Sequence, residues 1–124
     1  MKSKGRILVV DDEATILELV KAALEVGHYE VFIAGNGQEG LSGAIAQQPD
    51  LILLDVTMPI MDGFQLLAKL KNDERTKKIP VIMLTARDEA ESVYLSQQLK
   101  ANEYLMKPFT VEHLLDLVCK YSFK

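Results

Sequence analysis

Four short apolar runs in this sequence each end at side chains that can take part in chemistry. The polar residues that close or follow the runs 7–10, 51–54, 81–84 and 104–106 are, in order, Asp11 with Asp12, Asp55, Thr85, and Lys107. Runs of this length are typical of buried parallel strands, whose carboxyl ends lie along one edge of a sheet. Open α/β folds bind their ligands at that edge, so we expect three acids, a hydroxyl and an amine to converge there.

Clustered carboxylates repel one another unless a cation neutralises them. A hard divalent ion such as Mg²⁺ prefers oxygen ligands and often uses one or two carboxylates together with a phosphate group. The only histidines, His28 and His113, are isolated, and Cys119 lies in the predicted terminal helix. This composition argues against zinc, which is usually bound by groups of His and Cys.

An aspartate can also act as a nucleophile and form an acyl phosphate, provided that metal and ammonium groups offset the negative charge. Asp55 is the best nucleophile candidate because it is single and central, whereas Asp11 and Asp12 form an adjacent pair suited to holding a metal. Lys107 would supply the ammonium group, and Thr85 would donate a hydrogen bond to a phosphoryl oxygen.

Each of these residues also has an ordinary structural interpretation. Asp11 and Asp12 are acids that could cap the following helix. Thr85 could be a strand residue with high β propensity, and Lys107 a solvated surface lysine. The functional interpretation depends on their occurrence together.

Between the apolar runs, the spacing of apolar residues predicts helices at 14–26, 38–48, 64–71, 88–99 and 110–121. Further strands are predicted at residues 30–34 and 103–106. The first helix stops at Gly27, a favourable residue for a helix C-terminus, and Thr110 is a suitable N-cap for the last. Strands that alternate five times with helical connections indicate a doubly wound parallel sheet with helices on both faces.

Two glycines, Gly40 and Gly43, lie inside the second predicted helix. Each is expected to cost about 1 kcal/mol relative to alanine, which predicts that this helix is the least stable.

The chain has 124 residues, which is enough for one domain with its own core, and we expect a single domain over residues 1–124 with a core from 6 to 121. A net charge of −4 argues against direct binding of nucleic acid. The apolar run after the basic amino terminus is shorter than a signal peptide requires, and no run approaches a membrane span. We therefore expect a cytoplasmic protein without membrane contact.

The single cysteine, Cys119, lies in register with apolar residues of the last helix and is expected to be a core thiol.

Motifs of the chain, in order, are similar to those of the receiver domain of two-component response regulators. The resemblance runs from Arg6 to Tyr121 and is strongest to single-domain, chemotaxis-regulator-like members. The residues that carry it are Asp11-Asp12-Glu13, the segment from Asp55 through Thr57-Met58-Pro59 to Asp62-Gly63, Thr85-Ala86, and Tyr104-Leu105-Met106-Lys107-Pro108-Phe109. The resemblance implies a flavodoxin-like, five-stranded parallel sheet in the order 2-1-3-4-5.

The same resemblance implies that Asp55 accepts a phosphoryl group from a phosphohistidine of a sensor histidine kinase or phosphotransfer protein. Asp12, Asp55 and the main-chain carbonyl of Thr57 would bind Mg²⁺ directly, and Asp11 would help through water. Lys107 and Thr85 would hold the phosphoryl oxygens.

Further implications of the resemblance concern signalling. The Lys107-Pro108 peptide would be cis, which proline makes accessible. Thr85 would move toward the phosphoryl group and Tyr104 would change rotamer, although Tyr104 could instead be a core aromatic that never moves. The face made by the fourth helix, fifth strand and fifth helix would then bind a downstream protein or a second copy of the chain.

The chain departs from the family pattern at Lys100-Ala101, where the family usually has glycine-alanine. Glycine there would end the fourth helix with a positive φ, so either the helix ends differently or Asn102 takes over that conformation. Gly40 stands where the family tends to have alanine.

Two rival functions remain open. One is a receiver-like adaptor that binds partners without phosphorylation. The other is a Mg²⁺-dependent phosphatase or phosphotransferase that uses an aspartyl phosphate. Such an enzyme is expected to have a second acid two residues after the nucleophile, where this chain has Thr57. The leading interpretation is a phosphoacceptor that catalyses only its own phosphorylation and dephosphorylation.

Overall fold

The computed structural model of the protein describes residues 4–55, 63–85, 101–106 and 109–121. The strands are β1 (Arg6–Val10), β2 (Glu30–Ala34), β3 (Leu51–Asp55), β4 (Val81–Thr85) and β5 (Glu103–Met106). The helices in these ranges are α1 (Ala14–Val26), α2 (Gly37–Gln47), α3 (Gly63–Lys71) and α5 (Val111–Cys119). Each predicted strand is therefore present with the expected bounds to within one residue.

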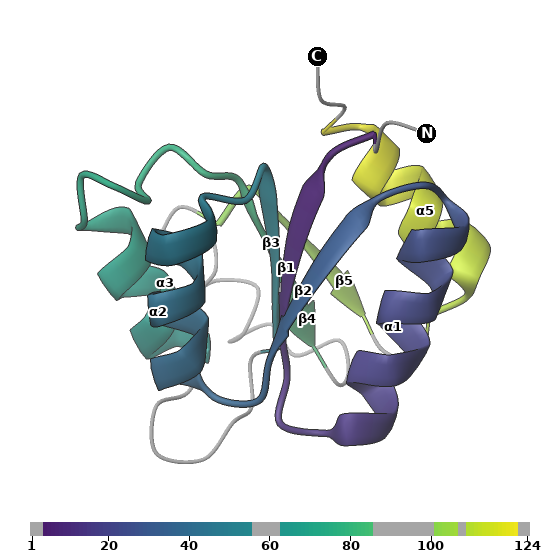
Figure 1. Ribbon diagram of the computed structural model, residues 1–124, viewed down its shortest axis with the longest axis horizontal. Coiled ribbons are helices and arrows are strands. Elements are labelled where there is room, and N and C mark those ends of the chain that lie inside the picture. The colour runs from purple at the N-terminus through teal and green to yellow at the C-terminus, as the bar shows by residue number, and fades with distance from the viewer. Residues whose placement is uncertain (1–3, 56–62, 86–100, 107–108, 122–124) are drawn as a thin grey trace.

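The five strands form one parallel sheet in the order β2-β1-β3-β4-β5. Helices α1 and α5 cover one face, and α2 and α3 cover the other (Figure 1). The predicted doubly wound, flavodoxin-like fold is confirmed. All five strands point the same way, so their carboxyl ends lie along one edge of the sheet.

Side chains of the central strands alternate between two cores, as the twofold period of a strand requires. Ile7 and Val9 of β1 belong to the core under α1 and α5, whereas Leu8 and Val10 belong to the core under α2 and α3. Strands β1 and β3 are buried on both faces along nearly their whole length. This explains why their sequences are continuous apolar runs rather than alternating ones.

Helix α2 begins one residue before the predicted start, because Asn36 is its N-cap. The Asn36 Oδ1 atom accepts a hydrogen bond of 2.9 Å from the N–H of Glu39, and a Glu39 carboxylate oxygen accepts one of 3.1 Å from the N–H of Gly35. An Asn followed three residues later by Glu is a recognised sequence signal for a helix start. Thr110 caps α5 in the same way, as predicted, with 3.0 Å between its Oγ1 atom and the N–H of His113.

Gly27 is the C-cap of α1, as predicted, but the left-handed conformation lies one residue later. Gly27 has a φ of −78°, whereas His28 has a φ of 71°. A Cβ atom at Gly27 would lie only 3.1 Å from a side-chain carbon of Leu115 in α5. Glycine at this position therefore permits close packing between helices rather than a positive φ.

Cys119 is exposed, so the prediction of a core thiol is wrong. The buried residues of α5 are Leu114, Leu117 and Val118. A helix turns by about 100° per residue, so the residue after Val118 is carried away from this stripe. The sequence pattern placed the apolar stripe one position too far round the helix.

Asn102 does not take over a positive φ, because His28 and Gln48 are the only non-glycine residues with positive φ in the described ranges. The predicted helix at 88–99 and the loop residues 58–62 lie outside these ranges, as does Lys100. No helix in the part of the chain that the structure describes is long and apolar enough to span a bilayer.

Candidate functional site

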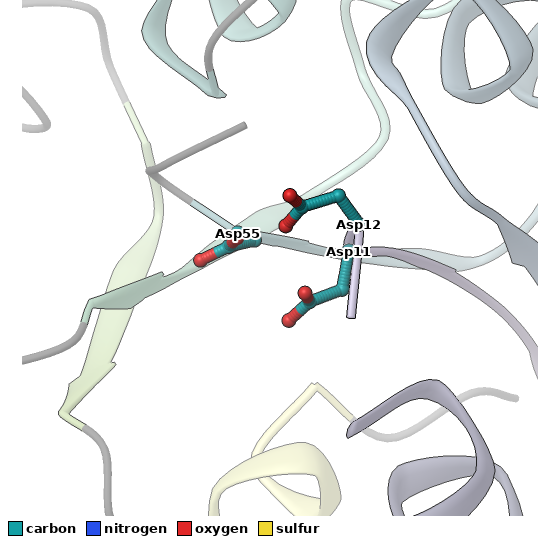
Figure 2. Close-up of side chains that lie close together, drawn as sticks. All are labelled: Asp11, Asp12 and Asp55. Carbon is teal, nitrogen blue, oxygen red and sulfur yellow. The ribbon is translucent and has the colours of Figure 1, made fainter. Parts of the chain in front are cut away.

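Three acids from two neighbouring strands lie together at the carboxyl edge of the sheet. Asp11 and Asp12 directly follow β1, and Asp55 is the last residue of β3. Figure 2 shows the side chains of the pair extending from the end of β1 beside Asp55. One carboxylate oxygen from each acid can be chosen so that all three atoms lie within 4.8 Å of one another.

The pairing of β1 with its neighbours brings these acids together. Val10 is paired with Leu54, so the residues that follow them, Asp11 and Asp55, reach the edge of the sheet side by side. The Asp11 N–H also donates a hydrogen bond of 3.1 Å to the carbonyl of Ala34 at the end of β2. The backbone at Asp11 is therefore held by the strand on its other side as well.

The three acids differ in burial. The exposed fraction is 0% for Asp11 and 4% for Asp55, whereas Asp12 is exposed. One Asp11 carboxylate oxygen accepts a hydrogen bond of 2.9 Å from the N–H of Glu13, the N-cap residue of α1. This bond holds the chain just before α1, but it is not a helix cap, which would accept a hydrogen bond from an N–H of the first turn.

The donor set fits a hard cation. All three side chains offer carboxylate oxygens, which Mg²⁺ prefers. Two oxygens bound to one Mg²⁺ lie at most about 4.2 Å apart, twice the usual metal–oxygen distance. A set that spans up to 4.8 Å therefore needs only small side-chain movements, or a bridging water, to share one ion.

The strand pairings bring the backbone of Thr85 and of Met106 to the same edge. Asp55 is paired with Leu84, so Thr85 follows the partner of Asp55 along β4, and Thr85 is in turn paired with Met106, the residue before Lys107. The side chain of Thr85 and the whole of Thr57, Lys107 and Pro108 lie outside the described part of the chain. The roles of these residues and the cis peptide stay predictions.

Tyr104 is 38% exposed on β5, so it is not the core aromatic of the structural interpretation. A groove of about 410 Å³ runs between β5 and α5 and is lined by the four β5 residues together with His113, Leu117 and Lys120. Met106, at the other end of the strand, is 40% exposed. The exposed side chains of Tyr104 and Met106 on β5 therefore lie beside this groove, and Lys120 adds a basic side chain to its lining.

Comparisons with known proteins agree with this arrangement. A family model described as the response regulator receiver domain matches residues 7–119. The chain is 44% identical over 110 residues to the "DNA-binding dual master transcriptional regulator RpaA" of Synechocystis, covering 89% of this chain and 46% of that protein. It thus spans about half the length of that curated relative, and the same holds for the next relatives.

Single-domain proteins are matched over most of their length. Protein PilH of Pseudomonas aeruginosa is 37% identical over 114 residues, which is 92% of this chain and 94% of PilH. The solved structure of the Vibrio cholerae chemotaxis protein CheY4 has a TM-score of 0.90 at 31% identity, covering 98% of this chain and 99% of that chain.

Proposed function

The chain belongs to the response regulator receiver domain family, and on this premise we propose that it is a phosphorylation-dependent signalling switch whose phosphoacceptor is Asp55. Receiver domains act in two-component signalling with sensor kinases and downstream targets and are not conventional enzymes on outside substrates. The observation that carries the proposal for this chain is the convergence of Asp11, Asp12 and Asp55 at the carboxyl edge of the sheet.

In the proposed reaction, a carboxylate oxygen of Asp55 attacks the phosphorus of a phosphohistidine on a sensor kinase or phosphotransfer protein. The P–N bond breaks, its electron pair returns to the imidazole nitrogen, and an aspartyl phosphate forms. Lys107 and Thr85 would hold the phosphoryl oxygens: Thr85 ends β4 one residue beyond the partner of Asp55, and Lys107 follows Met106, the partner of Thr85, in the sequence. Positioning and charge neutralisation are the main contributions that a protein makes to phosphoryl transfer.

Receiver domains generally bind Mg²⁺ at an acidic site, and the donor set of this chain fits that ion. Asp12, Asp55 and the Thr57 carbonyl would hold it directly, and Asp11 through water. This division suits Asp11, which is buried and already has one oxygen bonded to the N–H of Glu13. When bound, Mg²⁺ would offset the negative charge of the carboxylates and the phosphoryl oxygens.

The switch would be reset at the same residue. Water attacks the phosphorus, the bond between phosphorus and the Asp55 oxygen breaks, and inorganic phosphate leaves with the carboxylate regenerated. The chain would thus catalyse only its own phosphorylation and dephosphorylation, in the cytoplasm.

The proposed output surface is the face of the fourth helix, β5 and α5. It is supported by the exposed Tyr104 and Met106 and by the groove between β5 and α5. Movement of Thr85 toward the phosphoryl group and of Tyr104 behind it would change this face. A downstream protein or a second copy of the chain would then bind there.

The test is incubation with acetyl phosphate and Mg²⁺, followed by intact-protein mass spectrometry. We expect the wild type to gain one phosphoryl group and Asp55→Asn, an isosteric change that should leave the fold intact, to gain none. Chelation of Mg²⁺ should also prevent labelling.

No mass increase on the wild type would refute the switch and favour the adaptor without phosphorylation. Labelling of Asp55→Asn at another residue would count against Asp55 as acceptor. Multiple turnovers on an unrelated phosphate ester would favour the phosphatase.

A further inference from the structure

At the end of the sheet opposite the acids, one side chain completes the pairing of the last two strands. Asn102 lies just before β5 and opposite Val81, the first residue of β4. Its backbone N–H donates a hydrogen bond of 2.9 Å to the Val81 carbonyl, and its Oδ1 atom accepts one of 2.9 Å from the Val81 N–H. Asn102 therefore satisfies both backbone groups of a residue that is 0% exposed.

A second contact joins this pairing to the last helix. The hydroxyl of Tyr121 lies 3.3 Å from the Asn102 carbonyl oxygen and 3.1 Å from Oε2 of Glu103. Tyr121 is partly buried against the core under α1 and α5, and its N–H donates a hydrogen bond of 3.0 Å to the carbonyl of Val118. Burial, together with the hydrogen bond to Glu103, raises the pKa of Tyr121 to about 12, so its hydroxyl keeps its hydrogen at neutral pH.

Burial alone specifies the position of β5 weakly. Strand β3 is buried at all five residues, but β5 has a single buried side chain, Leu105. β5 is also an edge strand of the sheet. Register is firmly specified where a strand is buried and loosely where it is not, so an additional contact is needed to fix β5 against β4.

The register of this strand pair decides how two proposed site residues lie relative to each other. Thr85 ends β4, and β5 leads directly into Lys107. Thr85 and its partner Met106 each lie four residues beyond the Asn102–Val81 pair, about 13 Å along the strands, and Lys107 is the next residue in the sequence. A shift of one residue would move Lys107 by about 3.3 Å relative to Thr85, and even 1 Å of misplacement can slow a reaction about 100-fold.

We propose that Asn102, braced by Tyr121, is a positioning residue for phosphoryl transfer: it fixes β4 against β5 and so sets Thr85 and Lys107 in place around the phosphoryl group. This inference rests on the proposed function. The acids are carried by β1 and β3, whose register does not depend on Asn102. Loss of the Asn102 side chain should therefore slow the labelling of Asp55 without changing the affinity for Mg²⁺. A general loss of stability would lower both.

The experiment compares Asn102→Ala with wild type, both as the full chain at a temperature where circular dichroism shows each folded. We expect the rate of Asp55 labelling by acetyl phosphate to fall about tenfold, while the Mg²⁺ dissociation constant from calorimetry stays within about twofold. Asn102→Asp keeps an acceptor oxygen for the Val81 N–H and should recover labelling to within about threefold of wild type.

Asn36→Ala is the matched control, because it removes the same kind of bond, an Asn Oδ1 atom accepting a backbone N–H at 2.9 Å, from the start of α2. It should label at the wild-type rate. Tyr121→Phe keeps the ring but removes the hydroxyl, and should slow labelling about threefold even if Asn102→Ala does not fold.

A folded Asn102→Ala protein that labels as fast as wild type overturns the inference. So does one in which labelling and Mg²⁺ affinity fall together, because the side chain would then only support the fold. If Asn102→Ala does not fold, wild-type labelling by Tyr121→Phe overturns it. Failure of the wild type to label refutes the proposed function instead, so the two failures are distinguishable.

Discussion

Replacement of each glycine inside α2 by alanine should have opposite effects on stability. Both Gly40 and Gly43 have helical backbone conformations without a positive φ. Helix propensity alone therefore favours alanine by about 1 kcal/mol at either position. The surroundings of the added Cβ atom decide between them.

At Gly40 the added atom has no room. It would lie 3.0 Å from both Cγ atoms of Val10 and 3.0 Å from Cδ2 of Leu66. Val10 is a buried β-branched residue on β1, with a stiff χ1 angle, so it cannot turn aside easily. Overpacking of this kind costs about 1–3 kcal/mol, which leaves a net loss of about 1 kcal/mol after the gain in propensity.

At Gly43 the nearest atoms to the added Cβ are the Cδ atoms of Leu8, at 3.5 and 3.8 Å, which is ordinary van der Waals contact. The free energy of unfolding of Gly43→Ala should therefore be about 1 kcal/mol higher than that of the wild type. The two variants should differ by about 2 kcal/mol in urea unfolding, with unchanged m-values, or by about 8 °C in melting temperature. Equal stabilities, or a more stable Gly40→Ala, would refute the argument that close packing of α2 on Val10 requires glycine.

Two further predictions concern the backbone and an ion pair outside the site. His28→Gly should raise the urea midpoint by the equivalent of about 0.5–1 kcal/mol, because His28 has a φ of 71°. His28→Ala keeps the strain and should show no gain. The side-chain hydrogen bonds from Arg75 lower the pKa of the Asp73 carboxyl from an ordinary 3.8 to about 2. Because the pKa of Asp73 is lower in the folded than in the unfolded chain, its ionised form stabilises the fold. This stabilisation is complete above pH 3.8 and is lost as the pH falls toward 2. Arg75→Gln should return the Asp73 pKa toward 3.8 in a carboxyl NMR titration and remove this dependence; an unmoved titration would contradict it.

The sheet was predictable because its central strands obey one strong physical requirement. Strands buried on both faces are mostly apolar, and β1 and β3 contain the continuous apolar runs 7–10 and 51–54. Helix faces are less strongly specified, since one residue of rotation turns an apolar position outward. This is why Cys119 was placed in the core although it is exposed.

The acid cluster was predictable for a related reason. Once parallel strands are recognised, their carboxyl ends must meet, and Asp11 and Asp55 follow from their positions in the sequence. The hydrogen bond from the N–H of Glu13 to Asp11 was not predicted, because the sequence suggested only that Asp11 could cap the helix. A carboxylate has two oxygens that can accept, so this bond does not exclude the proposed water-mediated role of Asp11 at the metal.

The role of Asn102 could not be read from the sequence, because its partner Val81 is 21 residues away and the contact exists only after the strands are in register. The sequence indicated only that Lys100-Ala101 departs from the family pattern and that Asn102 could take over a positive φ. The contact joins the edge strand β5 to β4 at the end opposite the acids. Asp11 and Asp55 lie at the ends of β1 and β3, and the burial of both strands allows only one register between them. β5, which leads into Lys107 in the sequence, has one buried side chain, so under our proposal the position of Lys107 would depend on Asn102 at the far end of the strand. Under this proposal, apolar burial would position the acids, and backbone-to-amide hydrogen bonds would position Thr85 and Lys107. A single substitution would then impair one half of the site and leave the other intact.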